Sequence, residues 1–407
     1  MKVVHVTTSS RGGAGIAALR LHKALQKQGV ASAYVSKDLT VDFEGNEVLS
    51  SFFSYRKPTF FQKLGQKLYR IFFPTRAQKL QKQLTKHKES LNYEMLSVPF
   101  SNIKLASHPL LKEATIIHLH WVGLILDYPS FFSRVSKPIV WTLHDANPFM
   151  GLFHYKNDRQ RNQAVKTIDD AVQALKKNAV AYSNKLAIVS PSQWLLDDAH
   201  TSGFYSPRVS LNKVANSIDK TNVSGNNDSL KTTLGIDTNE RVLLVSAVSL
   251  DNYRKGIDLF QEALRIISFP LTILTLGKGQ LTTLNNQVKV IPLGYVDDAI
   301  KIQKYYAIAD GFVLPSREDN LPNTMLESLS AGTPVIGFAI GGLKEHIKEG
   351  VTGVLANTIN AASLAEAITT FYKSIDTYNS KTIKAYAEAN FAPENQAKKY
   401  LDIYTNL

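Results

Sequence analysis

The segment from Leu314 to Gly342 constrains the fold of this chain more than any other part of the sequence. An apolar run over 311–315 leads into a short acidic turn, and a helix is expected from Asn323 to about Ala331. A second apolar run and a Gly341–Gly342 turn follow. This order of strand, turn, helix and strand predicts a parallel α/β sheet that binds its ligand at the carboxyl ends of the strands.

Two carboxylates mark this segment. Asp319 and Glu327 are eight residues apart, about two helical turns, so both can face the same side. Carboxylate oxygens accept hydrogen bonds from neighbouring hydroxyl groups, which suits a sugar or a ribose. Acidic residues also favour the start of a helix electrostatically. That alternative accounts for Glu318 and Asp319, but not for Glu327.

The pattern resembles the signature of the retaining glycosyltransferases of family 4, also called group 1 glycosyl transferases. Their motif is an acid, seven residues and a Glu, followed by a Gly-x-Pro-Val element, and here the first acid is Asp319. The resemblance implies the GT-B fold, an α/β architecture of two Rossmann-like doubly wound parallel-sheet domains facing a cleft. It also implies a C-terminal helix that crosses back to the N-terminal domain.

Elsewhere the sequence alternates apolar, strand-like runs with helical stretches, as doubly wound sheets require. Runs of this kind predict an N-terminal, acceptor-side domain over residues 1–218. Residues 219–239 are rich in Asn, Ser, Thr, Asp and Gly, so we expect a linker there. A nucleotide-sugar-binding domain is expected over 240–392, and the resemblance assigns 393–407 to the crossing helix.

The composition limits where the chain acts. It has no cysteine, which excludes disulfides and thiolate metal sites and fits a reducing compartment. The first apolar run is too short for a signal sequence, and no apolar stretch is long enough to span a membrane. We therefore expect a cytoplasmic protein, with a possible peripheral position on the inner face of the cell membrane.

The net charge of +13 is concentrated in one segment. Between Arg56 and Lys88 there are ten Lys or Arg and no Asp or Glu, interleaved with aromatic residues and leucines. This pattern suits a helix on an anionic membrane surface. A solvated insertion is the main alternative, and an acidic partner is a further one. Nothing else in the sequence supports nucleic-acid binding, so we expect none.

Glycines follow the first expected strand. Gly13 and Gly15, with Asp38 after the second strand, match a dinucleotide-binding fingerprint, so a nicotinamide cofactor is one interpretation. The family resemblance instead places Gly13 and Gly15 near the donor diphosphate and the acceptor. Both interpretations rest on the close approach of glycine backbone to phosphate at a helix start.

Histidines lie at strand ends in the N-terminal half. His144 closes the run PIVWTLHD, which resembles a subgroup of family 4, and by that resemblance it contacts the transferred sugar. The alternative is a capping or core histidine. His118 and His120 point to the same side of a strand. A metal pair is conceivable there, but no third ligand is near in sequence, so packing and acceptor-side lining are favoured.

Two cations follow the first strand of the C-terminal half. By the resemblance, Lys255 binds the donor diphosphate, and Arg254 substitutes for an arginine that many relatives carry a few residues earlier. Exposed basic residues at a helix start are the alternative, but the helix dipole disfavours them. No two Asp are spaced D-x-D, the motif by which metal-dependent glycosyltransferases hold a divalent ion. We expect metal-independent transfer, with no metal and no cofactor.

The resemblance also assigns the remaining donor contacts. Glu327 is expected at the ribose hydroxyls, and Asp319, aided by Glu318, at the hydroxyls of the sugar. Backbone amides at the helix start are expected at the distal phosphate, and glycine turns after two strands at the base. These further donor-binding positions are Gly277, Lys278, Tyr295, Asn320, Leu321, Asn323 and Thr324.

The sequence therefore predicts a retaining, hexosyltransferase-like glycosyltransferase. It would move a sugar from a nucleotide diphosphate sugar to a hydroxyl of a glycan or lipid-linked glycan, in bacterial surface polysaccharide biosynthesis. Two alternatives keep the donor site. One is an epimerase of the same fold that acts on the nucleotide sugar itself, and the other is a non-catalytic binding subunit.

Overall fold

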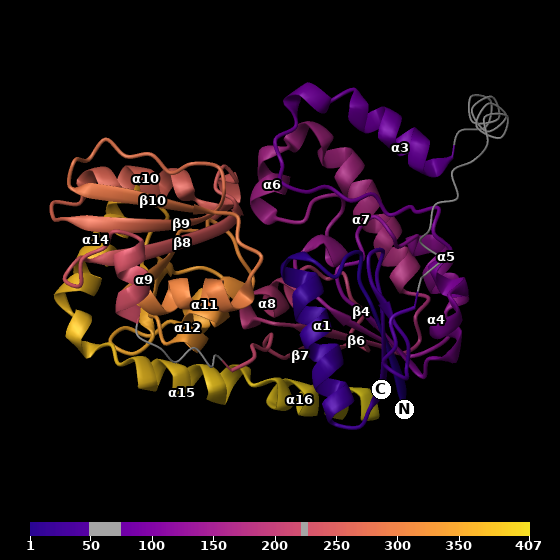
Figure 1. The fold of residues 1–407 in the computed structure, drawn as a ribbon. Helices are drawn as coiled ribbons and strands as arrows, with labels where there is room; N and C mark the ends of the chain where they lie inside the picture. Colours follow the sequence, from indigo (N-terminus) through magenta and orange to yellow (C-terminus); the bar gives the residue numbers. More distant parts are fainter. Residues whose placement is uncertain (49–74, 221–226) are drawn as a thin grey trace, which may run out of the picture. The chain divides into compact units, whose positions relative to one another are not determined.

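The structure is a computed structural model and describes residues 1–48, 75–220 and 227–407. These residues form two compact units, each built around a sheet (Figure 1). The first unit comprises Met1–Pro191, Leu195–Val214 and Ala397–Leu407. The second comprises Ser192–Trp194 and Ala215–Gln396. The expected α/β class with two Rossmann-like parallel-sheet domains is confirmed.

The sheet of the first unit has the strand order β3-β2-β1-β4-β5-β6-β7. Its pairs are parallel except β2 with β3, which is antiparallel. The order reverses between β1 and β4, and such a switch point is where open α/β sheets bind ligands. The strands are β1 (Lys2–Val6), β2 (Ala31–Val35), β3 (Thr40–Val41), β4 (Ile116–Leu119), β5 (Ile139–Thr142), β6 (Leu186–Ser190) and β7 (Ser210–Lys213).

Helices accompany these strands along the chain. The longer α-helices are α1 (Gly12–Lys27), α3 (Arg76–Thr85), α7 (Lys166–Val180), α8 (Gln193–Thr201) and α16 (Pro393–Thr405). The shorter α-helices are α4 (Pro109–Glu113), α5 (Tyr128–Arg134) and α6 (Lys156–Arg161). Single 3₁₀ turns are η1 (Lys88–Ser90), η2 (Leu105–Ser107), η3 (Asn147–Phe149) and η4 (Gln163–Val165).

The second unit has a wholly parallel sheet in the order β10-β9-β8-β11-β12-β13, with its switch point between β8 and β11. The strands are β8 (Val242–Ser249), β9 (Leu271–Lys278), β10 (Val288–Gly294), β11 (Gly311–Leu314), β12 (Val335–Phe338) and β13 (Gly353–Ala356). The helices are α9 (Asn227–Thr233), η5 (Tyr253–Lys255), α10 (Ile257–Ile266), α11 (Ala299–Ile308), α12 (Asn323–Ala331), α13 (Leu343–His346), α14 (Ala361–Lys373), η6 (Ile375–Thr377) and α15 (Ser380–Phe391).

Local sequence explains why the central elements form. Strands β11 and β12 are buried along their whole length, as expected for apolar strands covered on both faces. Helix α12 begins after Pro322 and ends at Gly332, which has φ +83°. A left-handed residue ends a helix at little cost only when it is glycine. The helix expected from Asn323 to about Ala331 is therefore confirmed.

The C-terminal helix α16 belongs to the first unit from Ala397 onward and runs beside α1 (Figure 1). Tyr400 and Tyr404 are buried in a core cluster with residues of α1, β1 and β5. The Tyr400 hydroxyl lies 2.7 Å from Thr142 Oγ1, and the Tyr404 hydroxyl lies 2.6 Å from His118 Nδ1. The predicted return of the last helix is thus fixed by packing and by two buried hydrogen bonds.

The described residues 227–239 of the predicted linker belong to the second unit. Helix α9 lies within this range, and Ile236 is buried in a core cluster of the second unit together with Ile218. Loss of that apolar burial would cost about 1.5–3 kcal/mol per side chain, so the segment is part of the domain. The predicted boundary at residue 218 also differs from the observed one between Val214 and Ala215. The prediction missed this because the segment is mostly polar and only Ile236 within it is a buried isoleucine.

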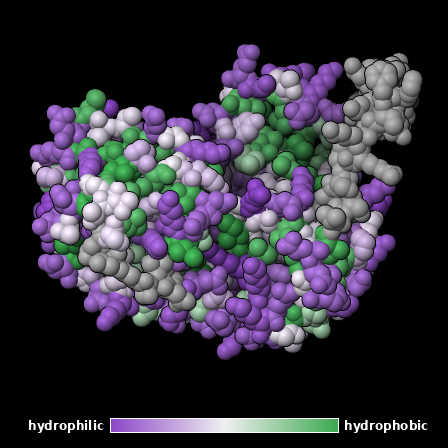
Figure 2. All heavy atoms as spheres, viewed as in Figure 1, coloured by the Kyte–Doolittle hydropathy of each residue, from purple (hydrophilic) through white to green (hydrophobic). Residues whose placement is uncertain are grey.

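The basic segment 56–88 lies partly outside the described residues. Its described part includes α3, which starts with a capping box between Thr75 and Gln78. Leu80 and Leu84 are buried, whereas Arg76, Lys79 and Lys82 are exposed. Hydrophilic and hydrophobic side chains both reach the surface in this part of the first unit (Figure 2). None of the helices over the described residues is long and apolar enough to cross a membrane.

Candidate functional site

The switch point of the second unit brings two distant segments together. Turn η5 follows β8, and the acidic turn follows β11, the strand beside it. Gly256 has φ +66°, and a Cβ there would lie 1.9 Å from the carbonyl oxygen of Pro315, so only glycine permits this approach. The Arg317 amide donates to the carbonyl of Arg254 at 2.7 Å. The two segments are therefore joined through their backbones.

Asp319 bridges the two predicted cations. Its Oδ1 accepts from Arg254 Nη1 at 2.9 Å, and its Oδ2 accepts from Lys255 Nζ at 2.7 Å. Ser316 Oγ donates to the same Oδ2 at 2.9 Å. The Asp319 side chain is 13% exposed. Burial alone would raise its pKa, but Lys255 and then Arg254 lower the pKa to about 2, so Asp319 is ionised.

This arrangement suits anion binding. Arg254 and Lys255 are oriented before any ligand arrives, and charged donors of this kind stabilise phosphate oxygens. A carboxylate has about four acceptor positions, and Asp319 Oδ1 accepts from Arg254. Asp319 therefore keeps acceptor capacity for a ligand hydroxyl while it holds both cations.

Arg317 is a residue that sequence reasoning missed. Its guanidinium donates to both carboxylate oxygens of Asp258 at 2.7 and 2.6 Å, and to the carbonyl of Tyr253 at 2.6 Å. It also lies 4.0 Å from the centroid of the Tyr253 ring. Bidentate Arg–carboxylate pairs fix geometry as well as charge. Arg317 thus clamps η5, which carries Arg254 and Lys255, to the acidic turn.

The other predicted residues of the acidic segment surround the start of α12. Gly341 and Gly342 pack on this turn, since a Cβ at Gly341 would lie 1.8 Å from the carbonyl oxygen of Asp319. The Gly342 amide donates to the Asn320 carbonyl at 2.6 Å. Three of these residues are buried: Glu318, Asn320 and Leu321. Three others lie on α12 and are partly buried: Asn323, Thr324 and Glu327. The structure places all six in one segment of the second unit.

The predicted glycine turns lie at the ends of β9 and β10. Gly277 has φ +135°, and a Cβ there would lie 1.8 Å from the Ala247 carbonyl oxygen, so close strand packing requires glycine. Lys278 Nζ lies 5.6 Å from the centroid of the Tyr295 ring, and Tyr295 is exposed. These side chains form a cationic and aromatic pair at the same sheet edge.

Gly13 and Gly15 lie in the first turn of α1, in the first unit. Asp38 does not behave as the acid of a dinucleotide fingerprint. Its oxygens accept from the Ser9 hydroxyl at 2.8 Å, the Ser10 amide at 2.7 Å and the Ser36 hydroxyl at 2.7 Å. Burial opposes ionisation, but these bonds lower the pKa of Asp38 to about 2. Asp38 therefore holds the loop before α1 through these hydrogen bonds.

His144 follows β5 and lies at the end of a chain of imidazoles. His120 Nδ1 lies 3.1 Å from His144 Nε2, and His120 Nε2 lies 2.9 Å from His5 Nδ1. Burial lowers the pKa of His144 to about 4, so its ring is neutral at physiological pH. The chain of bonds orients His144, and His5 was not foreseen because it lies on β1, far away in sequence.

His5, His118 and His120 bring their nitrogens within 4.8 Å of one another. Their rings are stacked or tilted, however: His118 and His120 have centroids 4.1 Å apart at 26°, and His5 and His120 5.2 Å apart at 28°. An imidazole lone pair lies in the ring plane, so stacked rings do not direct their lone pairs at one ion. His118 also hydrogen-bonds Thr142 and Tyr404. The geometry favours packing over metal binding.

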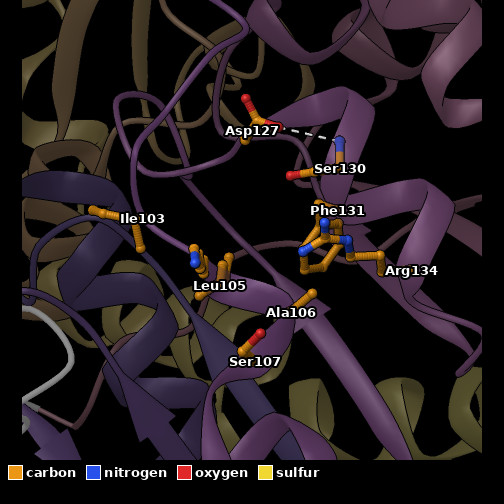
Figure 3. Close-up of a pocket in the computed structure, with 9 residues that line it drawn as sticks. Ile103, Leu105, Ala106, Ser107, Asp127, Ser130, Phe131 and Arg134 are labelled. Atoms are coloured by element: carbon orange, nitrogen blue, oxygen red, sulfur yellow. Dashed lines mark hydrogen bonds between the residues drawn. The ribbon is translucent and has the colours of Figure 1, made fainter.

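A pocket at the carboxyl ends of β4 and β5 includes His144. It is lined by His120, Trp121, Val122, Gly123, Tyr128, Trp141, His144, Asp145, Asn147, Pro148 and His154. A second pocket lies between η2 and α5, where Asp127 accepts from the Ser130 amide (Figure 3). None of the predicted site residues lines that second pocket.

Part of the second unit matches a known protein family. Residues 239–374 match the family model of group 1 glycosyl transferases. Glycogen synthase from Thermodesulfovibrio yellowstonii is 28% identical over 196 residues, which are 45% of this chain and 39% of the synthase. The chain therefore spans about two fifths of the length of that curated relative.

Solved structures share the fold over the whole chain. Sucrose-phosphate synthase from Thermosynechococcus elongatus superposes with a TM-score of 0.65 at 16% identity, covering 100% of this chain and 99% of that one. The Anabaena protein HepE in complex with UDP-glucose gives a TM-score of 0.63 at 16% identity and covers 100% of both chains. The protein thus has the GT-B fold. Its second unit carries a group 1 glycosyl transferase domain.

The ion cluster predicts a pH dependence of stability. Because the pKa of Asp319 falls from 3.8 to about 2 on folding, the ionised cluster stabilises the fold above about pH 4 by roughly 2 kcal/mol. This contribution is lost as the pH falls toward 2. Urea unfolding of wild type and Asp319→Asn should differ at pH 7 and converge at low pH. A difference that stays constant with pH would contradict the assignment.

The Arg317 clamp predicts a measurable coupling. In a double-mutant cycle with Arg317→Met and Asp258→Asn, the unfolding free energies should show a coupling of about 1–2 kcal/mol, because the pair is bidentate. The matched control is the pair Lys220 and Glu388, whose side chains are 68% and 56% exposed. We expect less than about 0.5 kcal/mol there. Equal coupling energies for the two pairs would contradict a positioning role of Arg317.

Proposed function

We propose that this protein is a retaining glycosyltransferase that uses a nucleotide diphosphate sugar as donor and requires no metal ion. One observation carries the proposal: Arg254, Lys255 and Asp319 meet at the switch point of a domain that matches the group 1 family. The similarity to HepE, which was solved with UDP-glucose, supports a nucleotide sugar as the donor.

The proposed chemistry follows from the charges. Lys255 and Arg254 bind the diphosphate and stabilise the negative charge that grows on it as the bond to the sugar breaks. Amides at the start of α12 bind the distal phosphate. The acceptor hydroxyl oxygen bonds to the anomeric carbon on the face that the diphosphate leaves, and its proton passes to a leaving phosphate oxygen. The electron pair of the broken bond stays on the diphosphate.

The remaining contacts of the donor are proposed from the same resemblance. Glu327 accepts from the ribose hydroxyls, and Asp319 Oδ1, near Glu318, accepts from a sugar hydroxyl. His144 hydrogen-bonds the transferred sugar as a neutral imidazole, consistent with its lowered pKa. Lys278 and Tyr295, with the Gly277 turn, are proposed near the base.

For the acceptor, we propose a hydroxyl of a glycan or lipid-linked glycan of a surface polysaccharide. The basic residues of α3 support a peripheral position at an anionic membrane, where each Lys or Arg contributes about 1 kcal/mol to binding. A cytoplasmic location on the inner face of the cell membrane would bring the protein to a lipid-linked acceptor.

The donor site can be tested by ligand-induced stabilisation. We expect one nucleoside diphosphate among ADP, GDP, UDP and dTDP to raise the melting temperature, with and without EDTA. A ligand at 100 times its Kd adds about 2.7 kcal/mol. Lys255→Ala should abolish this stabilisation, and Glu327→Ala should reduce sugar transfer on the order of 100-fold, since charge-assisted contacts are lost.

Each of the other outcomes would indicate a different function for this protein. Stabilisation only by NAD or NADP would overturn the proposal and restore the dinucleotide interpretation of Gly13 and Gly15. Conversion of the nucleotide sugar without an acceptor would identify the epimerase. Donor binding without any turnover would identify a binding subunit, and full activity of Glu327→Ala would overturn the site assignment.

Membrane binding is tested with vesicles. Replacing Arg76, Lys79 and Lys82 by Gln should weaken cosedimentation with phosphatidylglycerol vesicles roughly 100-fold, because about three charge contacts are lost. The control variant carries Gln at Lys381, Lys398 and Lys399, which are exposed elsewhere. Equal vesicle binding by both variants would retire the membrane role of α3.

A further inference from the structure

The pocket around Trp121 lies at the carboxyl ends of β4 and β5, one strand from the switch point between β1 and β4. Strands β1 and β4 are neighbours there, and the loops after both strands are joined. The Thr8 amide donates to the Trp121 carbonyl at 2.7 Å, and the Thr8 hydroxyl donates to the Gly123 carbonyl at 2.5 Å. The pocket thus lies at the carboxyl edge of the first sheet, the edge at which open α/β sheets receive ligands.

The indole of Trp121 is held in one orientation. Its Nε1 donates to Asp145 Oδ2 at 2.7 Å, and its ring stacks on His154 with centroids 5.2 Å apart at 28°. The ring is partly exposed, although its polar edge is satisfied within the protein. A fixed aromatic ring with a satisfied N–H binds a partner through its face, at little cost in side-chain entropy.

Asp145 supplies a charged acceptor to the same pocket. His154 Nδ1 lies 2.6 Å from its Oδ2, and the Asn147 amide donates to its Oδ1 at 2.9 Å. Burial would raise the pKa of Asp145, but His154 and these hydrogen bonds hold the pKa below its ordinary value. Oδ1 accepts from Asn147 and keeps acceptor capacity for a ligand hydroxyl.

The chain Asp145–His154–Ser97 is not a nucleophile triad. His154 Nε2 lies 2.8 Å from Ser97 Oγ, a distance suited to proton transfer. Ser97 is only 2% exposed, however, and a Cβ at Gly123 would lie 2.7 Å from its Oγ, so the backbone covers the hydroxyl. The chain instead fixes the Asp145 carboxylate at the N–H edge of the indole.

The walls of the pocket are rigid. Lys176 is fully buried, and its ammonium donates to the carbonyls of Asn147 at 2.8 Å and Gly151 at 2.6 Å. Beside the pocket, Leu124 has φ +71° and is 47% exposed. A leucine in the left-handed region is strained, and such strain clusters at ligand-binding sites. The loop after β4 therefore presents an apolar side chain next to Trp121 at a conformational cost.

We propose that this pocket binds a pyranose ring of the acceptor, with its apolar face on Trp121 and its hydroxyls directed to Asp145. A pyranose combines an apolar C–H face with a rim of hydroxyls, and the pocket combines aromatic walls with a carboxylate and a neutral imidazole. The cavity is about 10 Å³ and partly open, with room for one water-sized group. One hydroxyl enters it, and the ring lies over its mouth. The assignment to an acceptor rests on the proposed function.

The test compares Trp121→Ala and Trp121→Phe with wild type. In transfer assays, Trp121→Ala should raise the acceptor KM about tenfold or more and leave the donor KM unchanged, because it removes the platform for the acceptor and the N–H that holds Asp145. Trp121→Phe retains an aromatic face and should have a smaller effect. The control Tyr182→Ala removes an exposed aromatic of the first unit and should change neither constant.

A second measurement does not require activity. The chain has three tryptophans, so the fluorescence difference between wild type and Trp121→Phe reports on Trp121. We expect at least one methyl glycoside of glucose, galactose, mannose or N-acetylglucosamine to quench this signal without donor. Stabilisation of both variants by the nucleoside diphosphate shows that the second unit is folded.

The outcomes separate this inference from the proposed function. Quenching at Trp121 without sugar transfer in wild type keeps the sugar site and refutes the transferase. Transfer by wild type with an unchanged acceptor KM in Trp121→Ala overturns the sugar site and keeps the transferase. The inference also fails when none of the glycosides quenches the Trp121 signal, whether or not wild type transfers sugar.

Discussion

Parallel pairing of β8 with β11 is the constraint on which the candidate site depends. The register aligns Leu244 with Phe312 and Val245 with Val313, so the two strands end side by side. The chain leaves both strands at the same sheet edge, because parallel strands point the same way. Lys255 and Asp319 are 64 residues apart, and this pairing brings them within 2.7 Å.

The first unit uses the same constraint with different chemistry. Pairing of β1 with β4 aligns His5 with His118, and burial holds the pKa of both rings well below the ordinary value. Neutral imidazoles can be buried because they hydrogen-bond to each other and to hydroxyl groups. Burial of charged imidazoles would cost much more free energy. The switch point of the first unit is therefore surrounded by uncharged aromatic rings. The switch point of the second unit is surrounded by charged side chains.

The charged site is costly to bury and is stable only as a complete network. Arg254 and Lys255 share one carboxylate, and Arg317 holds their backbone through Asp258 and Tyr253. Removing one member of a buried ion cluster leaves its partners without compensation. The glycines at positions 256 and 341 matter for the same reason, since a side chain at either would separate the segments that carry the charges.

The sequence by itself determined the α/β alternation, the two parallel-sheet domains and the limits of α12, because hydrophobic period, Pro322 and Gly332 are local signals. It also marked Arg254, Lys255 and Asp319 as candidates, without showing that they form one cluster. Only the tertiary structure decided that Arg317 clamps η5, that His5 joins His120, and that residues 227–239 belong to the second domain. Those facts depend on contacts between side chains of different strands or layers. The spacing of residues along the chain does not predict such contacts.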